Sequence, residues 1–184
     1  MILVISVCLD KLSELEFVRP VENVLKDVNV RFFTGHYTRI ARDDLDEAKK
    51  VVICGTALKD FDYLENADKF SWLREFEKPV LGICAGFQIV GKVFGNEVVE
   101  DTRIGQFKVD VIRKTKLISK AEFCSYFLNS KTVKTEKPFV TVAKSGKLAS
   151  IIKHESKEIY GCLFHPEVLN PEIIVNFCEA LTGS

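Results

Sequence analysis

Short apolar runs alternate with amphipathic segments through the first half of the chain. Continuous apolar runs are typical of strands covered on both faces, and apolar residues at helical spacing are typical of helices packed on a sheet. We expect strands at Ile2–Val7, Val28–Phe33, Val51–Cys54 and Pro79–Ile83. We expect helices at Phe17–Leu25, Asp43–Lys50, Phe70–Phe76 and Ala85–Phe94. This repetition predicts an α/β fold with an open, mostly parallel sheet flanked by helices.

The second half of the chain has a different pattern. Gly105–Ile112 alternates apolar and polar residues, as strands with one exposed face do. Further strand signals lie at Phe139–Val142, Leu148–Ile152 and Ile159–Phe164, and a closing helix is expected at Glu172–Leu181. We therefore expect antiparallel strands added to the parallel core. Because no linker or repeat interrupts the pattern, residues 1–184 are expected to form a single domain.

The charges of the chain are balanced. Lys plus Arg and Asp plus Glu number 26 each, which gives a formal net charge of zero. A domain that grips nucleic acid by its phosphates needs a basic excess, so a nucleic-acid partner is not expected. The apolar N-terminal run lacks a basic leader, and no run reaches the length of a membrane span. The sequence predicts a soluble, cytoplasmic protein without a membrane partner.

The cysteines are scattered and form no Cys-x-x-Cys pair. They are Cys8, Cys54, Cys84, Cys124, Cys162 and Cys178. In a cytosolic chain the default is a free thiol, mostly buried as a small apolar side chain. A zinc site at Cys162-x-x-His165 is disfavoured, because this spacing on a strand sends the two side chains to opposite faces. No metal or cofactor is expected.

One cysteine lies where a nucleophile would be placed. The segment Gly82-x-Cys84-x-Gly86 follows an expected buried strand and opens an expected helix, which is the pattern of a nucleophile elbow with Cys in place of Ser. Such a turn crowds the backbone, and the flanking glycines relieve it. The helix N-terminus favours a thiolate, and the amide of Ala85 can face a developing oxyanion. The alternative is a buried cysteine in a tight junction.

A candidate base follows the strand expected at Ile159–Phe164. In His165-Pro166-Glu167, Pro166 restricts His165 to extended conformations, in which residues two apart face the same way. The carboxylate of Glu167 could then orient the imidazole and stabilise its charged form. The alternative is a solvent-facing ion pair at a strand end.

Together these segments resemble the class I, or triad, glutamine amidotransferases. The marks are Gly82-Ile-Cys84-Ala-Gly86-Phe-Gln88 and the segment Tyr160-Gly-Cys-Leu-Phe-His-Pro-Glu-Val168, in the family's order. The whole chain has the length of that domain, and it looks most similar to the glutaminase subunits of GMP synthases. The resemblance implies the family's fold, with a flavodoxin-like core.

The resemblance also implies a role for each matching residue. Cys84 would attack the side-chain amide of glutamine, His165 would take and return the proton, and Glu167 would orient His165. A thioester would form, ammonia would leave, and water would regenerate the enzyme. The oxyanion would be held by backbone amides at Gly55, Thr56 and Ala85. Gln88 matches a position that helps to hold substrate.

Three segments depart from the family's pattern. The usual Gly-Gly-Pro turn after the third strand is Cys54-Gly55-Thr56 here, so the proline is missing. A Ser-His-x-Asp-like segment is replaced by Cys124-Ser125-Tyr126-Phe127. The first strand ends in Val7-Cys8-Leu9-Asp10 instead of a Gly-rich turn. The triad is intact, whereas the residues that recognise the substrate are altered.

The chain has no Walker-type glycine loop for ATP. A glutaminase of this kind would therefore supply ammonia to a synthetase on another chain, and the resemblance points to an ATP-pyrophosphatase subunit. Two alternatives remain open at this point. One is a free-standing hydrolase of γ-glutamyl or related amides, and the other is a non-catalytic regulatory paralogue.

Overall fold

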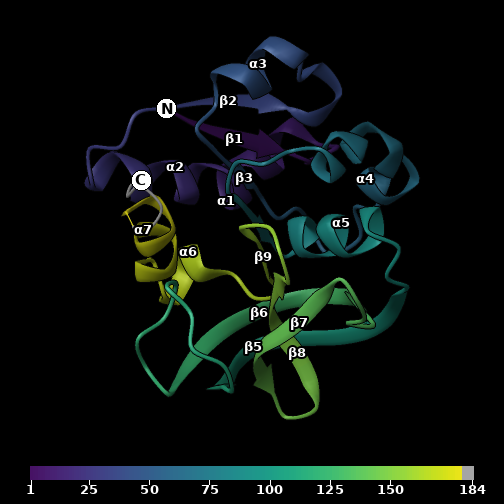
Figure 1. Cartoon of the computed structure of the whole chain (residues 1–184), viewed down its shortest axis with the longest axis vertical. Helices are drawn as coiled ribbons and strands as arrows, with labels where there is room; N and C mark the ends of the chain where they lie inside the picture. Colours follow the sequence, from purple (N-terminus) through teal and green to yellow (C-terminus); the bar gives the residue numbers. More distant parts are fainter. Residues whose placement is uncertain (180–184) are drawn as a thin grey trace.

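The computed structural model describes residues 1–179, which form an α/β fold around one large sheet (Figure 1). The strands are β1 (Ile2–Ser6), β2 (Phe32–His36), β3 (Lys50–Ile53), β4 (Val80–Ile83), β5 (Val98–Val111), β6 (Glu122–Val133), β7 (Phe139–Ser145), β8 (Leu148–His154) and β9 (Ile159–Cys162). The α-helices are α1 (Glu14–Phe17), α2 (Arg19–Asp27), α3 (Arg42–Glu47), α4 (Asp62–Glu65), α5 (Ala85–Val93), α6 (Pro166–Leu169) and α7 (Glu172–Glu179). Three 3-10 helices are η1 (Lys11–Ser13), η2 (Tyr37–Arg39) and η3 (Ala67–Arg74).

The strand order within the described residues is β2-β1-β3-β4-β9-β8-β7-β5-β6. The pairs from β2 through β9 are parallel, and the pairs from β9 through β6 are antiparallel. Figure 1 shows the parallel strands in the upper part of the molecule, the antiparallel strands in the lower part, and β9 between them. The expected fold class, a mostly parallel core with added antiparallel strands, is confirmed.

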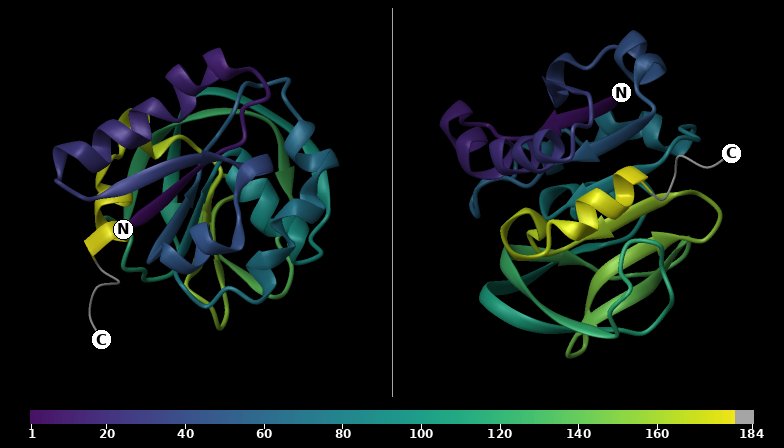
Figure 2. Two further views of the ribbon diagram at one scale, coloured as in Figure 1. Left: turned by 90° about the horizontal axis from the view of Figure 1, so that it is seen from above. Right: turned by 90° about the vertical axis from the view of Figure 1, so that its left-hand side faces the viewer.

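The sheet curls until its last strand reaches the middle of the molecule. The long hairpin of β5 and β6 follows a wide arc in the view from above (Figure 2). The free edge of β6 then meets the carboxyl ends of β4 and β9, because the amide of His165 donates to the carbonyl of Tyr126 at 2.8 Å. A strand at one end of the sheet order therefore forms a wall beside the parallel core.

Helices cover both faces of the parallel strands. Helix α2 packs with α6 and α7, while α5 packs with α4 and η3 and lies against β4 and β9 (Figure 1). Strands β1, β3 and β4 are buried along their whole length, as their continuous apolar runs predict. None of the helices in residues 1–179 is long and apolar enough to cross a membrane.

Several element boundaries differ from the sequence prediction. The strand expected at Val28–Phe33 is β2, which begins only at Phe32, because α2 ends in a turn with Asn29 at φ 55°. The segment expected as helix Phe70–Phe76 lies mostly in η3 and is 3-10 rather than α-helical. Strand β6 was not expected at all.

The end of the chain also differs from expectation. Strand β9 ends at Cys162, two residues before the predicted end at Phe164. Helix α7 begins at Glu172 as expected, and the end predicted at Leu181 lies outside the described residues.

Candidate active site

The strand-to-helix turn around Cys84 has the geometry of a nucleophile elbow. Cys84 stands between β4 and α5 with φ 50° and ψ −97°, a conformation that costs about 1–3 kcal/mol for a residue with a side chain. A Cβ on Gly82 would overlap the backbone of Gly86, and a Cβ on Gly86 would overlap the carbonyl oxygen of Ile53. Only glycine fits at both places, as the spacing of the motif predicts.

His165 lies at the N-terminus of α6 and contacts Glu167. The imidazole Nδ1 and the Glu167 Oε1 are 2.7 Å apart. The predicted reason for this contact was wrong: Glu167 does not follow in an extended segment, because Pro166 is the first residue of α6. The helical turn brings the two side chains together instead. Proline is well suited to this first helical position, since it lacks only an N–H that would have no partner in the helix.

The charge on His165 is strongly favoured despite its burial. The side chain is 2 % exposed, and Phe17 packs on it with ring centroids 5.7 Å apart. Burial alone lowers the pKa of His165, but the Glu167 carboxylate and the neighbouring Cys84 together raise this pKa well above its ordinary value. The imidazole Nε2 is buried and has no hydrogen-bond partner of good geometry in residues 1–179. It is therefore the nitrogen left to exchange a proton with Cys84.

The Cys84 thiol points at the wall made by β6. Its sulfur lies 3.4 Å from the carbonyl oxygen of Leu128, and the residue is 4 % exposed. Gly55, two residues beyond β3, lies next to both Cys84 and His165. A Cβ on Gly55 would lie 2.8 Å from His165 Cε1 and 3.3 Å from Cys84 Cβ. The structure thus brings Gly55, Cys84 and His165 into one cluster.

Backbone amides suited to an oxyanion surround this cluster. Ala85 is the first residue of α5, where the amide has no carbonyl within the helix to bond. The amides of Gly55 and Thr56 donate no hydrogen bond to any described residue. Three predicted oxyanion positions therefore lie around the nucleophile, at the carboxyl edge of the sheet where open α/β folds place ligands.

Gln88 lies in the wall of the site with its amide already bonded to the protein. Its Oε1 accepts from the Tyr63 hydroxyl at 2.7 Å, and its Nε2 donates to the carbonyl of Lys131 at 2.9 Å. The side chain is buried, and these bonds join α4 to β6 through α5. Contact of Gln88 with substrate remains a prediction.

The cavity next to Cys84 is small. Its volume is about 10 Å³, which is room for about one water molecule. One wall is the loop 56–61 and the other is Leu128–Ser130, and the Ser130 hydroxyl donates to the carbonyl of Leu58 at 3.1 Å between them. A glutamine side chain therefore requires these walls to part.

The wall residues were not found from the sequence. The structure places Leu128–Ser130 beside Cys84, a few residues beyond the segment Cys124–Phe127 that the family pattern suggested. Ser125 is instead fully buried, and its hydroxyl has no partner among the described residues. Only the register of β6 could have identified the facing residues, and β6 was not predicted.

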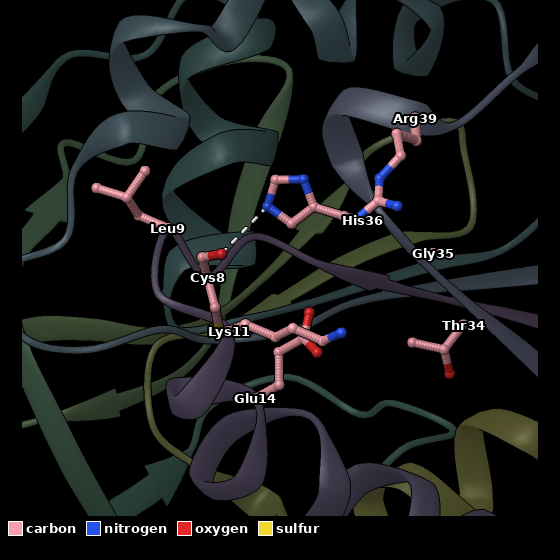
Figure 3. A pocket seen from close by; sticks show the side chains of 8 residues that line it. All are labelled: Cys8, Leu9, Lys11, Glu14, Thr34, Gly35, His36 and Arg39. Atoms are coloured by element: carbon pink, nitrogen blue, oxygen red, sulfur yellow. Dashed lines mark hydrogen bonds between the residues drawn. The ribbon is translucent and has the colours of Figure 1, made fainter.

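A wider hollow of about 380 Å³ lies apart from Cys84, at the carboxyl ends of β1 and β2 (Figure 3). Its lining includes Lys11, Glu14, His36 and Arg39, and His36 Nε2 lies 3.1 Å from the carbonyl oxygen of Cys8. Neither Cys84 nor His165 contributes to it. Among the described residues no group of His, Cys, Asp and Glu is arranged to hold a metal ion.

Comparison with known proteins agrees with this arrangement. The model of the family "Glutamine amidotransferase class-I" matches residues 16–176. The chain is 34% identical over 113 residues to a subunit of the glutamine-hydrolyzing GMP synthase of Methanococcus maripaludis, covering 56% of this chain and 60% of that protein. It is 34% identical over 116 residues to the corresponding subunit from Methanosphaera stadtmanae, covering 55% and 61%. These matches thus span about three fifths of the curated relatives.

Solved structures share the fold. A proposed GMP synthase subunit from Thermoplasma acidophilum superposes with a TM-score of 0.83 at 22% identity, covering 96% of this chain and 92% of that one. A glutamine amidotransferase from Thermotoga maritima gives 0.71 at 19% identity, covering 90% and 76%. The family match extends over most of the chain, including the elbow, the histidine–carboxylate pair and the wall. The chain therefore belongs to the class I glutamine amidotransferase family.

Proposed function

We propose that this protein hydrolyses the side-chain amide of glutamine to glutamate and ammonia. The observation that carries the proposal is the clustering of three groups. These are a cysteine on a nucleophile elbow, a buried histidine beside it, and a carboxylate 2.7 Å from the far nitrogen of that histidine. Nucleophile, base and orienting group in this order are the signature of covalent acyl-transfer catalysis.

Each group has a defined part in the proposed reaction. His165 holds the proton of Cys84, so Cys84 attacks the amide carbon as a thiolate, and the oxyanion is held by the amides of Gly55, Thr56 and Ala85. His165 then returns the proton to the leaving nitrogen, so ammonia departs and a thioester remains. Water, deprotonated by His165, hydrolyses the thioester and releases glutamate. Glu167 keeps the imidazole in the required orientation and stabilises its charged form.

The ammonia is proposed to serve a synthetase on another chain. The relatives from Methanococcus maripaludis and Methanosphaera stadtmanae are named as GMP synthase subunits, and "glutamine-hydrolyzing" is part of both names. By this likeness the partner would be an ATP-pyrophosphatase subunit. The small volume of the cavity beside Cys84 supports dependence on a partner, because the free chain then has little room for substrate.

A free-standing hydrolase of γ-glutamyl or related amides is the second candidate. It is favoured by the wall that faces Cys84, where Leu128, Asn129 and Ser130 offer neither histidine nor acid to a substrate. Rapid turnover by the isolated chain, with a γ-glutamyl amide preferred over glutamine, would support this candidate.

The test is labelling with a glutamine-analogue chloroketone, followed by mass spectrometry of the intact protein and its peptides. We expect modification at Cys84, slowed by added glutamine and absent in Cys84→Ala. The exposed Cys124 is an internal control for unselective reaction. Slow labelling of several cysteines at equal rates, without protection by glutamine, would contradict the proposal.

A further inference from the structure

A single carboxylate ties the loop after β3 to the loop after β1. Asp60 Oδ2 accepts a hydrogen bond from the Thr56 hydroxyl at 2.6 Å and another from the backbone amide of Leu9 at 2.8 Å. Leu9 follows β1, and Thr56 follows β3 and Gly55. Hydrogen bonds to an ionised acceptor are among the stronger ones in proteins. Asp60 therefore fixes the position of Thr56 relative to a neighbouring strand.

Both carboxylate oxygens of Asp60 are used within the protein. The amide of Asp62 donates to Oδ1 at 3.3 Å, and the amide of Asp60 itself donates to the carbonyl of Ala57 at 2.9 Å. The loop between Thr56 and Asp62 is thus held by its own side chains. No hydrogen bond joins Asp60 to Cys84 or His165 in the described part of the chain.

The bond between Thr56 and Asp60 matters because no proline ring restrains the backbone at Thr56. Family members usually carry a proline at the position of Thr56, and a proline ring fixes its own φ. Thr56 has no ring, so the peptide unit between Gly55 and Thr56 is free to rotate unless its side chain is held. Gly55 lies against both Cys84 and His165, so a rotation of this peptide unit would reorient the Thr56 amide relative to Cys84.

We propose that Asp60 is a positioning residue, which holds the Thr56 amide toward the oxyanion through its bond to the Thr56 hydroxyl. The hydrogen bond restrains the backbone at a position where family members have a proline ring, which has no N–H to donate. This inference rests on the proposed function, because it concerns the oxyanion that forms when Cys84 attacks a carbonyl.

Two electrophiles separate this role from a general structural one. In the proposed site the Cys84 thiolate attacks the chloroketone at its carbonyl carbon, which puts negative charge on the oxygen, and the sulfur then displaces chloride from the adjacent carbon as the carbonyl reforms. Iodoacetamide alkylates the same thiolate by displacement of iodide at a saturated carbon, so no oxyanion forms. Loss of an oxyanion donor costs about 100- to 1,000-fold in rate, and we expect misdirected amides to cost at least about tenfold.

The variants are Asp60→Ala, Thr56→Val and the double mutant, with Asp68→Ala as a matched change at an exposed acid on η3. In Asp60→Ala and Thr56→Val the limiting rate with chloroketone should fall at least about tenfold, while the iodoacetamide rate at Cys84 stays within about twofold. The double mutant should be no slower than the slower single mutant, because both changes break one bond. Thr56→Ser, which retains the hydroxyl, should keep more of the rate than Thr56→Val.

Other outcomes would overturn the inference. Equal losses with both reagents would mean a distorted site, and unchanged rates would mean that Asp60 has no part. If Asp60→Ala raised the chloroketone concentration needed for half of the limiting rate and left the limiting rate unchanged, Asp60 would be a substrate ligand. A wild-type chain in which iodoacetamide modifies Cys84 while the chloroketone leaves it unlabelled would overturn the proposed function, and the inference with it. A labelled wild type with unaffected variants would overturn the inference alone.

Discussion

At the scale of single residues, the site depends on a histidine that is both buried and charged. Removal from water opposes the charge on His165, and Glu167 and Cys84 restore it. Glu167 is itself almost fully buried, and its second oxygen has no partner in residues 1–179. A buried carboxylate that satisfies only one oxygen is costly unless its partner carries the opposite charge. Each member of the pair therefore depends on the other.

Glu167→Gln should lower the pKa of His165, since the variant loses the carboxylate charge that raises it. The titration of the imidazole by NMR is the measurement, with the exposed acid variant Glu16→Gln as a control. An unchanged His165 pKa in Glu167→Gln would show that Cys84 alone sustains the charge.

The same pair makes stability depend on pH. Because the pKa of His165 is higher in the folded chain than in the unfolded one, the folded state holds a proton that the unfolded state has lost above about pH 6.5. The stabilisation is fully present below that pH and declines as the pH rises toward the folded pKa, by at most about 1.4 kcal/mol per pH unit from this group. Urea denaturation between pH 6 and 9 should show a steeper fall of the unfolding free energy in the wild type than in Glu167→Gln.

At the scale of elements, the elbow and the wall β6 decide whether the residues meet. The elbow requires close approach of α5 to β3, where Gly86 touches the Ile53 carbonyl. The wall requires that β6 bend back to the parallel core, where Tyr126 and Leu128 receive hydrogen bonds from His165 and Cys84. Neither element would place the nucleophile without the other.

Gly86→Ala should destabilise the fold, because its methyl group would overlap the Ile53 carbonyl and force β3 and α5 apart. Overpacking of this kind costs about 1–3 kcal/mol, which denaturant unfolding can measure. Ala85→Gly, which removes a methyl group at the preceding residue, is a comparison that changes helix propensity without adding bulk. Equal stability in Gly86→Ala and wild type would show that β3 and α5 can move apart at little cost in free energy.

Ser130→Ala should open the cavity, because it removes the hydroxyl that bonds to Leu58 across the two walls. We expect iodoacetamide to modify Cys84 a few times faster in this variant, since such a bond is worth about 0.5–1.5 kcal/mol. Ser125→Ala on the same strand is the matched control, because the Ser125 hydroxyl has no partner among the described residues. If both variants react with iodoacetamide at the wild-type rate, separation of the two walls does not limit the access of iodoacetamide to Cys84.

The sequence predicted the parallel strands, the elbow and the residues of the triad because each has a local pattern. Continuous apolar runs, paired glycines around Cys84 and a proline after His165 can all be read within a few residues. Strand β6 could not be read in this way. On its buried face Ser125 and Asn129 alternate with Phe127, so polar residues stand where an apolar pattern would have marked a strand. The wall and the Asp60 anchor depend on that missing strand and on long-range contacts.

At the scale of the whole molecule, the candidate site has little room for a ligand. Cys84 and His165 are almost inaccessible, and the cavity beside Cys84 has room for about one water. Substrate entry must therefore be linked to a movement of the loop after β3 away from β6. A ligand that binds only the open form shifts the population toward it, and a partner that contacts this loop would do the same.

A general thiol reagent should modify the isolated protein in a defined order. Cys124 is exposed, whereas Cys84 and the other four cysteines are buried. We expect iodoacetamide to modify Cys124 first and Cys84 later, with peptide mass spectrometry over time as the measurement. Faster modification of Cys84 than of Cys124 would contradict a closed resting state.

Hydrogen exchange of residues 56–61 and 128–130 tests whether substrate opens the walls. The measurement compares the Cys84→Ser variant with and without added glutamine.

The curl of the sheet has a consequence for how the protein is made. The ribosome delivers the elbow about 80 residues before it delivers His165. At roughly 5–20 residues per second, Cys84 waits roughly 4–16 s for its base. Strand β6 emerges within that interval, so the wall is made before the histidine that bonds to it. By the proposed mechanism, a chain that stops before His165 carries the cysteine without its base and hydrolyses no glutamine.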